Sequence, residues 1–218
     1  MDVFIRPAVR GPSRRDDTSG LSPEGVHAKA KVCLVGANTG CKTNLVRKHV
    51  LDTFDDRYIT TVGTKVSKKE MRLDASAARV PVTLDFLVWD IMSHLGFREL
   101  FKEAYFYGAK GILAVTDMTR RKTLEDLEAW IRGVESVTGH IPIVVIGANY
   151  DKRDRLQVSE EEVRRVAEAH GAPCFFASGG SSEPVEAAFR HLADAVLQSM
   201  HQARGNAGGR EEHDSRPA

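Results

Sequence analysis

The 218-residue chain is predicted to form an α/β domain in which helices flank a doubly wound, mostly parallel, six-stranded sheet. Two observations predict this class. Short apolar runs alternate with amphipathic segments along the chain, and a glycine-containing segment follows the first apolar run directly. In sheets of this kind, ligands bind beyond the carboxyl ends of the strands, so we expect the functional residues there.

Six apolar runs predict strands, at about residues 30–35, 66–73, 80–89, 111–116, 141–147 and 173–177. Helices are predicted after Lys42, over 97–107, over the segment with apolar residues from Leu124 to Val137 on one face, and over 185–200. The helix that ends near His170 has a capping box formed by Ser159 and Glu162, with Val158 and Val163 spaced as a hydrophobic staple.

The composition excludes several classes of protein. A formal net charge of +1 gives no electrostatic footprint for nucleic acid or for a membrane surface. The odd count of three cysteines favours a reducing, cytoplasmic location. No apolar run approaches the roughly 18 residues of a membrane span, and the C-terminal residues contain no cysteine for prenylation. Residues 1–27 and 203–218 lack periodicity, so disordered tails are expected around a domain of residues 28–202.

The segment after the first strand is predicted to be a P-loop, which binds phosphate. It contains Gly36, Lys42 and Thr43 at the spacing of the Gly-x-x-x-x-Gly-Lys-[Ser/Thr] pattern, although Cys41 occupies the second glycine position and Gly40 stands one position early. Backbone N–H groups and the helix dipole would attract the phosphates there. Lys42 would reach the β- and γ-phosphates, and the Thr43 hydroxyl would hold Mg²⁺.

An imperfect motif of this length also arises by chance. Its position between a predicted strand and a predicted helix supports phosphate binding over a chance match. Cys41 has two interpretations, a tolerated replacement of glycine or a thiol of lowered pKa at a helix start. Further polar residues stand at or just after the predicted strand ends, namely Asp90, Asp117, Asp151 and Ser178. Of these, Asp117 is interpreted as a cap between strand and loop.

Four segments carry a family signature. They are Phe54-x-x-x-Tyr58-Ile-Thr-Thr61-Val-Gly63, Trp89-Asp90-Ile-Met-Ser93-His94-Leu-Gly-Phe97-Arg98, Tyr105-Phe-Tyr107-Gly-Ala-Lys-Gly111-Ile and Gly147-Ala148-Asn149-Tyr150-Asp151. In order and spacing they resemble the effector loop, the Trp-Asp-Thr-Ala-Gly-Gln segment, the Tyr-Tyr-Arg-Gly-Ala segment and the Asn-Lys-x-Asp segment of Rab proteins. Residues 29–202 therefore resemble a Ras-superfamily small GTPase of the Rab branch, with departures in several motifs.

The resemblance implies a role for each matching residue. Mg²⁺ would be held by Thr43, Thr61 and Asp90, the last through water, and Thr61 and Lys42 would act on the γ-phosphate. Asp151 would accept two hydrogen bonds from the guanine N1 and exocyclic amine, a charge-assisted pairing. The residues expected to contact GTP or GDP are Gly36, Asn38, Thr39, Gly40, Cys41, Lys42, Thr43, Asn44, Phe54, Thr61, Ser93, Asn149, Asp151, Ser178 and Gly179.

The departures from the family pattern concern catalysis and base binding. His94 stands where the family has the catalytic glutamine, and Ser93 replaces the glycine before it. Ala148 and Asn149 replace the base-reading asparagine and lysine, and the Ser-Ala-Lys loop is reduced to Ser178 followed by two glycines. Weaker nucleotide binding and slow hydrolysis are therefore expected.

Two main hypotheses follow. In the first, the protein is a GTP-binding switch whose segments 54–65 and 91–102 bind effector and regulator proteins. In the second, it is a pseudo-GTPase scaffold with little or no nucleotide turnover. An ATP-binding P-loop protein is a third possibility, which Asp151 argues against. The lack of a C-terminal cysteine is expected of a prokaryotic, or archaeal, relative without a prenyl anchor.

Overall fold

The computed structural model describes residues 26–36, 40–42, 44–45, 59–61, 64–73, 81–91 and 103–208, with the backbone alone at 59–61 and 204–208. Seven strands form one sheet in these residues, in the order β2-β3-β4-β1-β5-β6-β7. The strands are β1 Val26–Gly36, β2 Ile59–Thr61, β3 Thr64–Leu73, β4 Val82–Ile91, β5 Ala109–Asp117, β6 Ile143–Ala148 and β7 Cys174–Ala177. The helical elements include α3 Arg121–Glu125, α4 Leu127–Thr138, the 3₁₀ turn η1 Arg153–Arg155, α5 Glu160–Ala169 and α6 Glu183–Gly208. Residues 41–42 and 44–45, called the P-loop helix below, and residues 103–106 are also helical.

The sheet has the mostly parallel, doubly wound topology that the sequence predicts. Strands β4, β1, β5, β6 and β7 run parallel to one another, whereas β3 is antiparallel to both β4 and β2. The chain order reverses beside β1, where successive connections proceed to opposite sides of that strand. Such a reversal is where an open α/β sheet leaves a crevice for a ligand.

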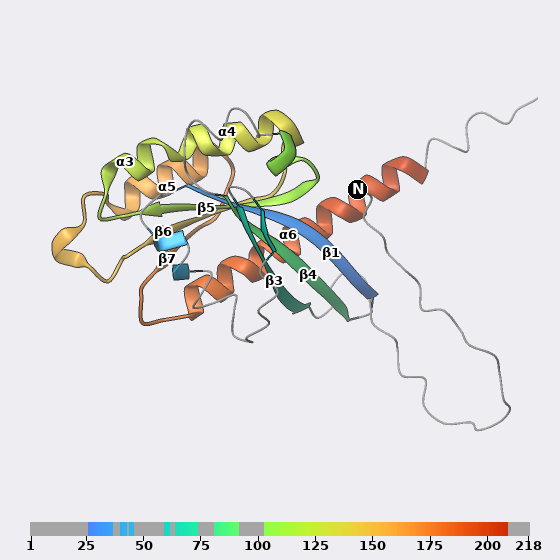
Figure 1. The fold of residues 1–218 in the computed structure, drawn as a ribbon, viewed down its shortest axis with the longest axis horizontal. Coiled ribbons are helices and arrows are strands. Elements are labelled where there is room, and N and C mark those ends of the chain that lie inside the picture. Colours follow the sequence, from blue (N-terminus) through green and yellow to red (C-terminus); the bar gives the residue numbers. More distant parts are fainter. Residues whose placement is uncertain are drawn as a thin grey trace, which may run out of the picture.

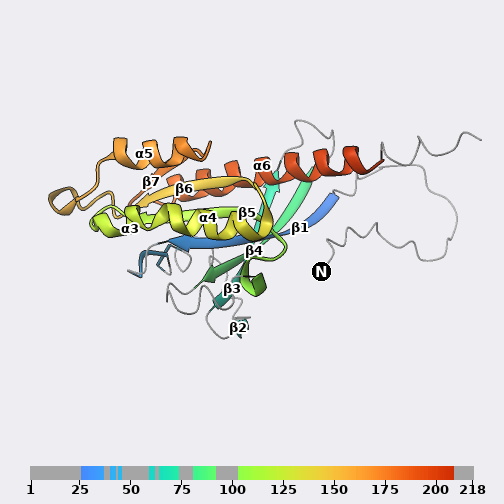
Figure 2. The ribbon, with the colours of Figure 1, turned by 90° about the horizontal axis from the view of Figure 1, so that it is seen from above.

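Two cores lie on the two faces of the sheet because side chains alternate along each strand. Helix α6 covers one face and packs on residues such as Leu34, Phe86 and Val88. Helices α3, α4 and α5 cover the other face, where Trp130, Ile131 and residues of β5 and β6 are buried. Figures 1 and 2 show α4 and α6 on opposite sides of the strands. No helix in the described ranges has both the length and the apolar composition that a membrane span needs.

Several boundaries differ from the predicted ones. The seventh strand, β2, lies in a polar segment and forms through antiparallel backbone pairing with β3, which hydrophobic periodicity does not report. The helix predicted around Trp130 consists of α3 and α4, separated by the single residue Asp126. Helix α6 continues to Gly208, so the expected disordered tail from residue 203 is wrong for its first six residues. Adding residues to a formed helix costs little, and alanine and arginine favour it.

Helix α5 begins as predicted. The Ser159 hydroxyl accepts a hydrogen bond from the Glu162 N–H, and the Glu162 carboxylate accepts one from the Ser159 N–H, which confirms the capping box. The predicted staple residues Val158 and Val163 are both buried in the same core. Hydrogen bonds from Arg121 first, and from Ser159 second, lower the pKa of Glu162 to about 2.

Glu162 should therefore make the stability depend on pH in acid. A carboxyl whose folded pKa lies below its ordinary value of 4.5 stabilises the fold above that value, and the contribution is lost as the pH falls through about 2. We expect the difference in unfolding free energy between the wild type and Glu162→Gln, from urea titrations, to shrink between pH 4.5 and 2. Glu161→Gln is the control, because Glu161 is an exposed neighbour outside the capping box. A difference in unfolding free energy for Glu162→Gln that stays constant down to pH 2 would contradict the prediction.

Candidate functional site

The predicted polar residues meet at one edge of the sheet. Gly36 ends β1, Asp117 ends β5, and Asp90 is the penultimate residue of β4. The loops that contain Asp151 and Ser178 follow β6 and β7 directly. All five strands are parallel, so their carboxyl ends lie together, as predicted.

Gly36 is required by its position. Its φ is +107°, and a Cβ atom there would lie 2.1 Å from the backbone oxygen of Val115 on the neighbouring strand β5. No side chain fits at that distance, because the opposing atom belongs to a backbone inside the sheet. The glycine therefore lets the chain turn out of β1 toward the helix that contains Lys42.

The Lys42 ammonium lies next to the backbone of this glycine. Its Nζ donates a hydrogen bond to the Gly36 carbonyl oxygen over 3.1 Å, and the residue is only 4% exposed. Burial lowers the pKa of Lys42, while the nearby Asp90 carboxylate and Cys41 act in the opposite direction. A desolvated cation at the start of a helix is suited to bind a phosphate, because both the charge and the helix dipole attract an anion.

Cys41 fits at the second glycine position of the motif without backbone strain. It is helical, and Asn149 is the single non-glycine residue with positive φ among the described residues. The left-handed conformation falls instead on Gly40, with φ of +78°, whose carbonyl oxygen accepts the first helical hydrogen bond from the Asn44 N–H. Cys41 itself is buried in the core beneath α6. The geometry thus favours the interpretation of Cys41 as a tolerated replacement.

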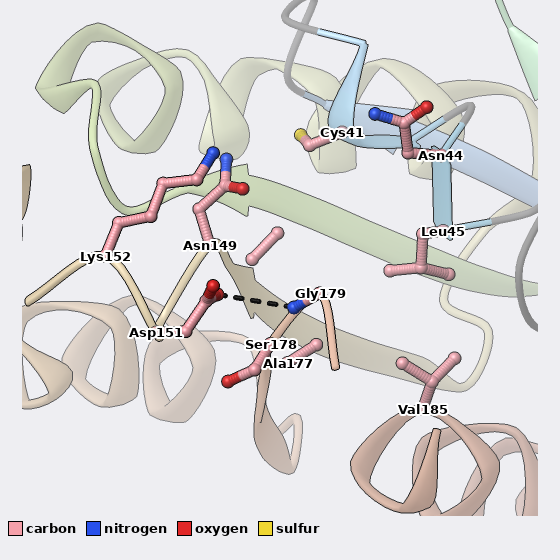
Figure 3. A pocket seen from close by; sticks show the side chains of 11 residues that line it. Cys41, Asn44, Leu45, Asn149, Asp151, Lys152, Ala177, Ser178, Gly179 and Val185 are labelled. Atoms are coloured by element: carbon pink, nitrogen blue, oxygen red, sulfur yellow. Dashed lines mark hydrogen bonds between the residues drawn. The ribbon is translucent and has the colours of Figure 1, made fainter. Parts of the chain in front are cut away.

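A cavity of about 230 Å³ opens beside this helix start (Figure 3). The P-loop helix borders it on one side, and the loops after β6 and β7 border it on the other. Asp151 projects from the first of these loops, and its carboxylate accepts a hydrogen bond from the Gly179 N–H over 3.3 Å. The cavity is lined by Cys41, Asn44, Leu45, Ala148, Asn149, Asp151, Lys152, Ala177, Ser178, Gly179 and Val185.

Asn149 lines the cavity and also holds the loop. Its side-chain amide donates a hydrogen bond to the Asp117 carboxylate over 2.8 Å, and its own φ of +62° is one that asparagine tolerates. Asp117 is 3% exposed and also accepts hydrogen bonds from the N–H and hydroxyl of Thr119. The predicted capping role of Asp117 is therefore confirmed, and the bond to Asn149 is an additional role.

The structure brings together the predicted residues Gly36, Gly40, Cys41, Lys42, Asn44, Asp90, Asn149, Asp151, Ser178 and Gly179 at this edge. The predicted residues Asn38, Thr39, Thr43, Phe54, Ser93 and His94 lie outside the described residues, and Thr61 is described by its backbone in β2. Sequence reasoning missed Leu45, Ala148, Lys152, Ala177 and Val185 as lining residues. For Lys152 the sequence offers one indication, because this residue directly follows Asp151. The apolar residues cannot be told from ordinary core residues by their sequence pattern.

The fold and the site together define a P-loop nucleotide-binding protein, since a buried lysine at a strand-loop-helix junction and a carboxylate-containing cavity share one sheet edge. The model of the Ras family matches residues 31–198. Ras-related protein Rab-8B of Bos taurus is 29% identical over 173 residues, which cover 79% of this chain and 80% of the relative. Ras-related protein Rab-13 of Canis lupus familiaris is 29% identical over 178 residues, covering 81% and 84%. The chain belongs to the Ras family, and it is a Rab-like small GTPase.

Proposed function

We propose that the protein binds GTP and GDP with Mg²⁺ and works as a slow molecular switch. The observation that carries the proposal is that the buried Lys42 lies on the same helix start as Cys41 and Asn44, which line one cavity together with Asp151. Lys42 presents a buried cation to phosphate, and Asp151 presents a carboxylate to a base. Membership of the Ras family supports guanine nucleotides in particular.

The phosphate end has a donor set that suits Mg²⁺. Asp90 is 8% exposed at the end of β4, and its carboxylate acts on the Lys42 ammonium electrostatically. Mg²⁺ prefers oxygen ligands and keeps several waters, so a carboxylate together with the hydroxyls of Thr43 and Thr61 would hold it. When bound, the metal would neutralise charge on the β- and γ-phosphates.

The base end favours guanine over adenine. The Asp151 carboxylate can accept hydrogen bonds from the two donors on the guanine N1–C2 edge, whereas it would repel the acceptor N1 of adenine. The side-chain atoms of Leu45, Ala177 and Val185 supply an apolar surface for the ring. Ala148 supplies no polar side chain here, which supports weaker binding than the family pattern implies.

The switch itself would lie in segments 54–65 and 91–102, to which effector and regulator proteins would bind. Strands β2 and β3 join the first segment to β4, which leads into the second, so a change near the γ-phosphate can reach both. The three cysteines lie in the described part of the chain and form no disulfide with one another, which supports a cytoplasmic location. A prokaryotic origin stays a prediction.

The nucleotide that copurifies with the protein tests the proposal. Freshly purified protein is denatured, and the supernatant is run on an anion-exchange column. We expect GDP or GTP in near-stoichiometric amount when Mg²⁺ is present throughout, and less after EDTA treatment. Adenine nucleotide would contradict guanine recognition, and protein without nucleotide that also fails to bind added GDP would favour the scaffold hypothesis.

Intrinsic hydrolysis should be slow, at or below the roughly 10⁻⁴ s⁻¹ of an unassisted Ras-like protein. A glutamine offers an acceptor and a donor to one water, whereas the two ring nitrogens of His94 point in opposite directions. We expect His94→Gln combined with Ser93→Gly to raise the rate. Single-turnover phosphate release across pH 5.5 to 8.5 checks both points, because titration of His94 near its ordinary pKa of about 6.5 would give a pH-dependent rate. Fast release by the wild type would overturn the prediction, and a flat profile would exclude control by His94.

A further inference from the structure

The side chain of Tyr150, the residue before Asp151, lies in a stack that no part of the proposed chemistry uses. Its ring packs against Phe176 of β7 with centroids 5.3 Å apart and an angle of 36°. The Arg153 guanidinium lies 3.6 Å from the centroid of the Tyr150 ring, and that of Arg164 lies 4.9 Å from the centroid of Phe176. The four side chains form a layered cluster of rings and cations.

Helix α5 fixes the outer end of this stack. The Tyr150 hydroxyl donates a hydrogen bond to the Glu160 carboxylate, which also accepts one from Arg164 over 3.4 Å. The bond from Tyr150 is the main cause of a lowered pKa at Glu160, in agreement with the geometry. Since α5 begins with a complete capping box, its first turn is a firm attachment point.

The sheet accommodates the stack through Gly147. A Cβ atom at this position of β6 would lie 2.9 Å from the Phe176 ring and 2.9 Å from the Met118 sulfur. The glycine therefore lets the Phe176 ring and the Met118 sulfur approach the backbone of β6 closely. The Tyr150 N–H also donates to the Ala177 carbonyl oxygen over 3.1 Å, so backbone and ring both join the loop to β7.

The loop is consequently attached on both sides. Asn149 binds Asp117 at the end of β5, and Tyr150 binds β7 and α5, while β6 lies between β5 and β7. Asp151 follows at once and lines the cavity. Its carboxylate is exposed and has a 3.3 Å hydrogen bond to Gly179, so its direction depends strongly on the backbone before it.

We propose that Tyr150 and Phe176 are positioning residues that aim the Asp151 carboxylate at the base and so set the preference for guanine. The proposal rests on the proposed function and deepens it. Tyr150 and Phe176 do not line the cavity themselves, so the stack acts from behind the loop through the direction of one carboxylate.

The test compares dissociation constants for GDP and for inosine diphosphate in the full chain. Hypoxanthine lacks the exocyclic amine of guanine, so the ratio of the two constants measures one of the hydrogen bonds to Asp151. We expect the wild type to bind GDP at least about tenfold more tightly, the size of one charge-assisted hydrogen bond. Tyr150→Ala and Phe176→Ala should bring the ratio to within about threefold of unity, and Tyr150→Phe should keep it within about twofold of the wild type.

The neighbour of Phe176 provides a matched control. Phe175 is on the same strand but packs on the other face, with its ring 6.3 Å from that of His191 on α6. Phe175→Ala removes the same ring and should lower the thermal unfolding temperature without changing the ratio. If Tyr150→Ala does not fold, Tyr150→Leu keeps the apolar volume without the planar ring, and the ratio is expected to fall for it too.

The outcomes separate the two proposals. A wild type that binds neither nucleotide would overturn the proposed function, and the positioning role with it. A wild type that binds the two equally would overturn recognition of the guanine amine by Asp151, and therefore the positioning role, while GDP binding itself stands. A wild type that prefers GDP, with stack variants that lose stability but keep the ratio, would overturn the positioning role alone. An equal fall in the ratio for Phe175→Ala would also overturn it, because the effect would then be general destabilisation.

Discussion

Replacing Lys42 with alanine is expected to raise the dissociation constant for GDP at least about 100-fold while leaving the fold intact. The ammonium is buried at the helix start, where charge-assisted hydrogen bonds to phosphate contribute about 1.5–3 kcal/mol each. The fold should tolerate the change, because burial already disfavours the charged form of Lys42 and lowers its pKa. Fluorescent GDP titration and circular dichroism measure the two effects.

Lys31 offers the matched control for this experiment. It is a half-buried lysine of strand β1, its pKa is likewise lowered by burial, and its Nζ donates to the Tyr107 carbonyl oxygen over 2.9 Å. Lys31→Ala should leave GDP affinity within about threefold of the wild type, because its ammonium contacts the Tyr107 carbonyl oxygen and the Trp89 ring, and it does not line the cavity. A thermal shift by GDP that survives in Lys42→Ala would show that the P-loop assignment is wrong.

Replacing Asp151 with asparagine should redirect the site from guanine to xanthine nucleotides. Xanthine presents a carbonyl oxygen where guanine has the exocyclic amine, so a donor is needed in place of one carboxylate oxygen. The hydrogen bond from the Gly179 N–H favours the asparagine carbonyl on that side, which leaves the amide to face the base. We expect the ratio of GDP to xanthosine diphosphate affinity to change by at least about 100-fold, the combined effect of losing one pairing and gaining another.

The exposed acid Asp154, three residues along the chain in η1, is the control for Asp151. Asp154→Asn removes the same charge, and its side chain is paired with Arg155 at the surface. It should leave the ratio unchanged. Competition titrations with GDP, GTP, ATP and xanthosine diphosphate measure these preferences. Equal competition by ATP and GTP against the wild type would rule out Asp151 as the base-reading residue.

The sequence by itself determined the class of fold, because the features that specify it are local. Apolar runs bounded by turn residues mark β1, β5 and β6, and the capping box at Ser159 marks the start of α5 within four residues. The order of strands and helices then places the strand ends at one edge. The rule predicts that Gly36, Asp90, Asp117 and Asp151 lie at the same edge of the sheet, and they do.

Only the tertiary structure decided how the site is held. The bond between Asn149 and Asp117 joins residues 32 positions apart, and the packing of Tyr150 on Phe176 joins the loop after β6 to strand β7. Hydrophobic periodicity reports which face of an element is buried, but not which side chain it meets there. The backbone likewise explains why a cysteine is tolerated at position 41, because the left-handed conformation falls on Gly40, one residue earlier. Contacts of this kind depend on the packing of the whole sheet, so no local pattern specifies them.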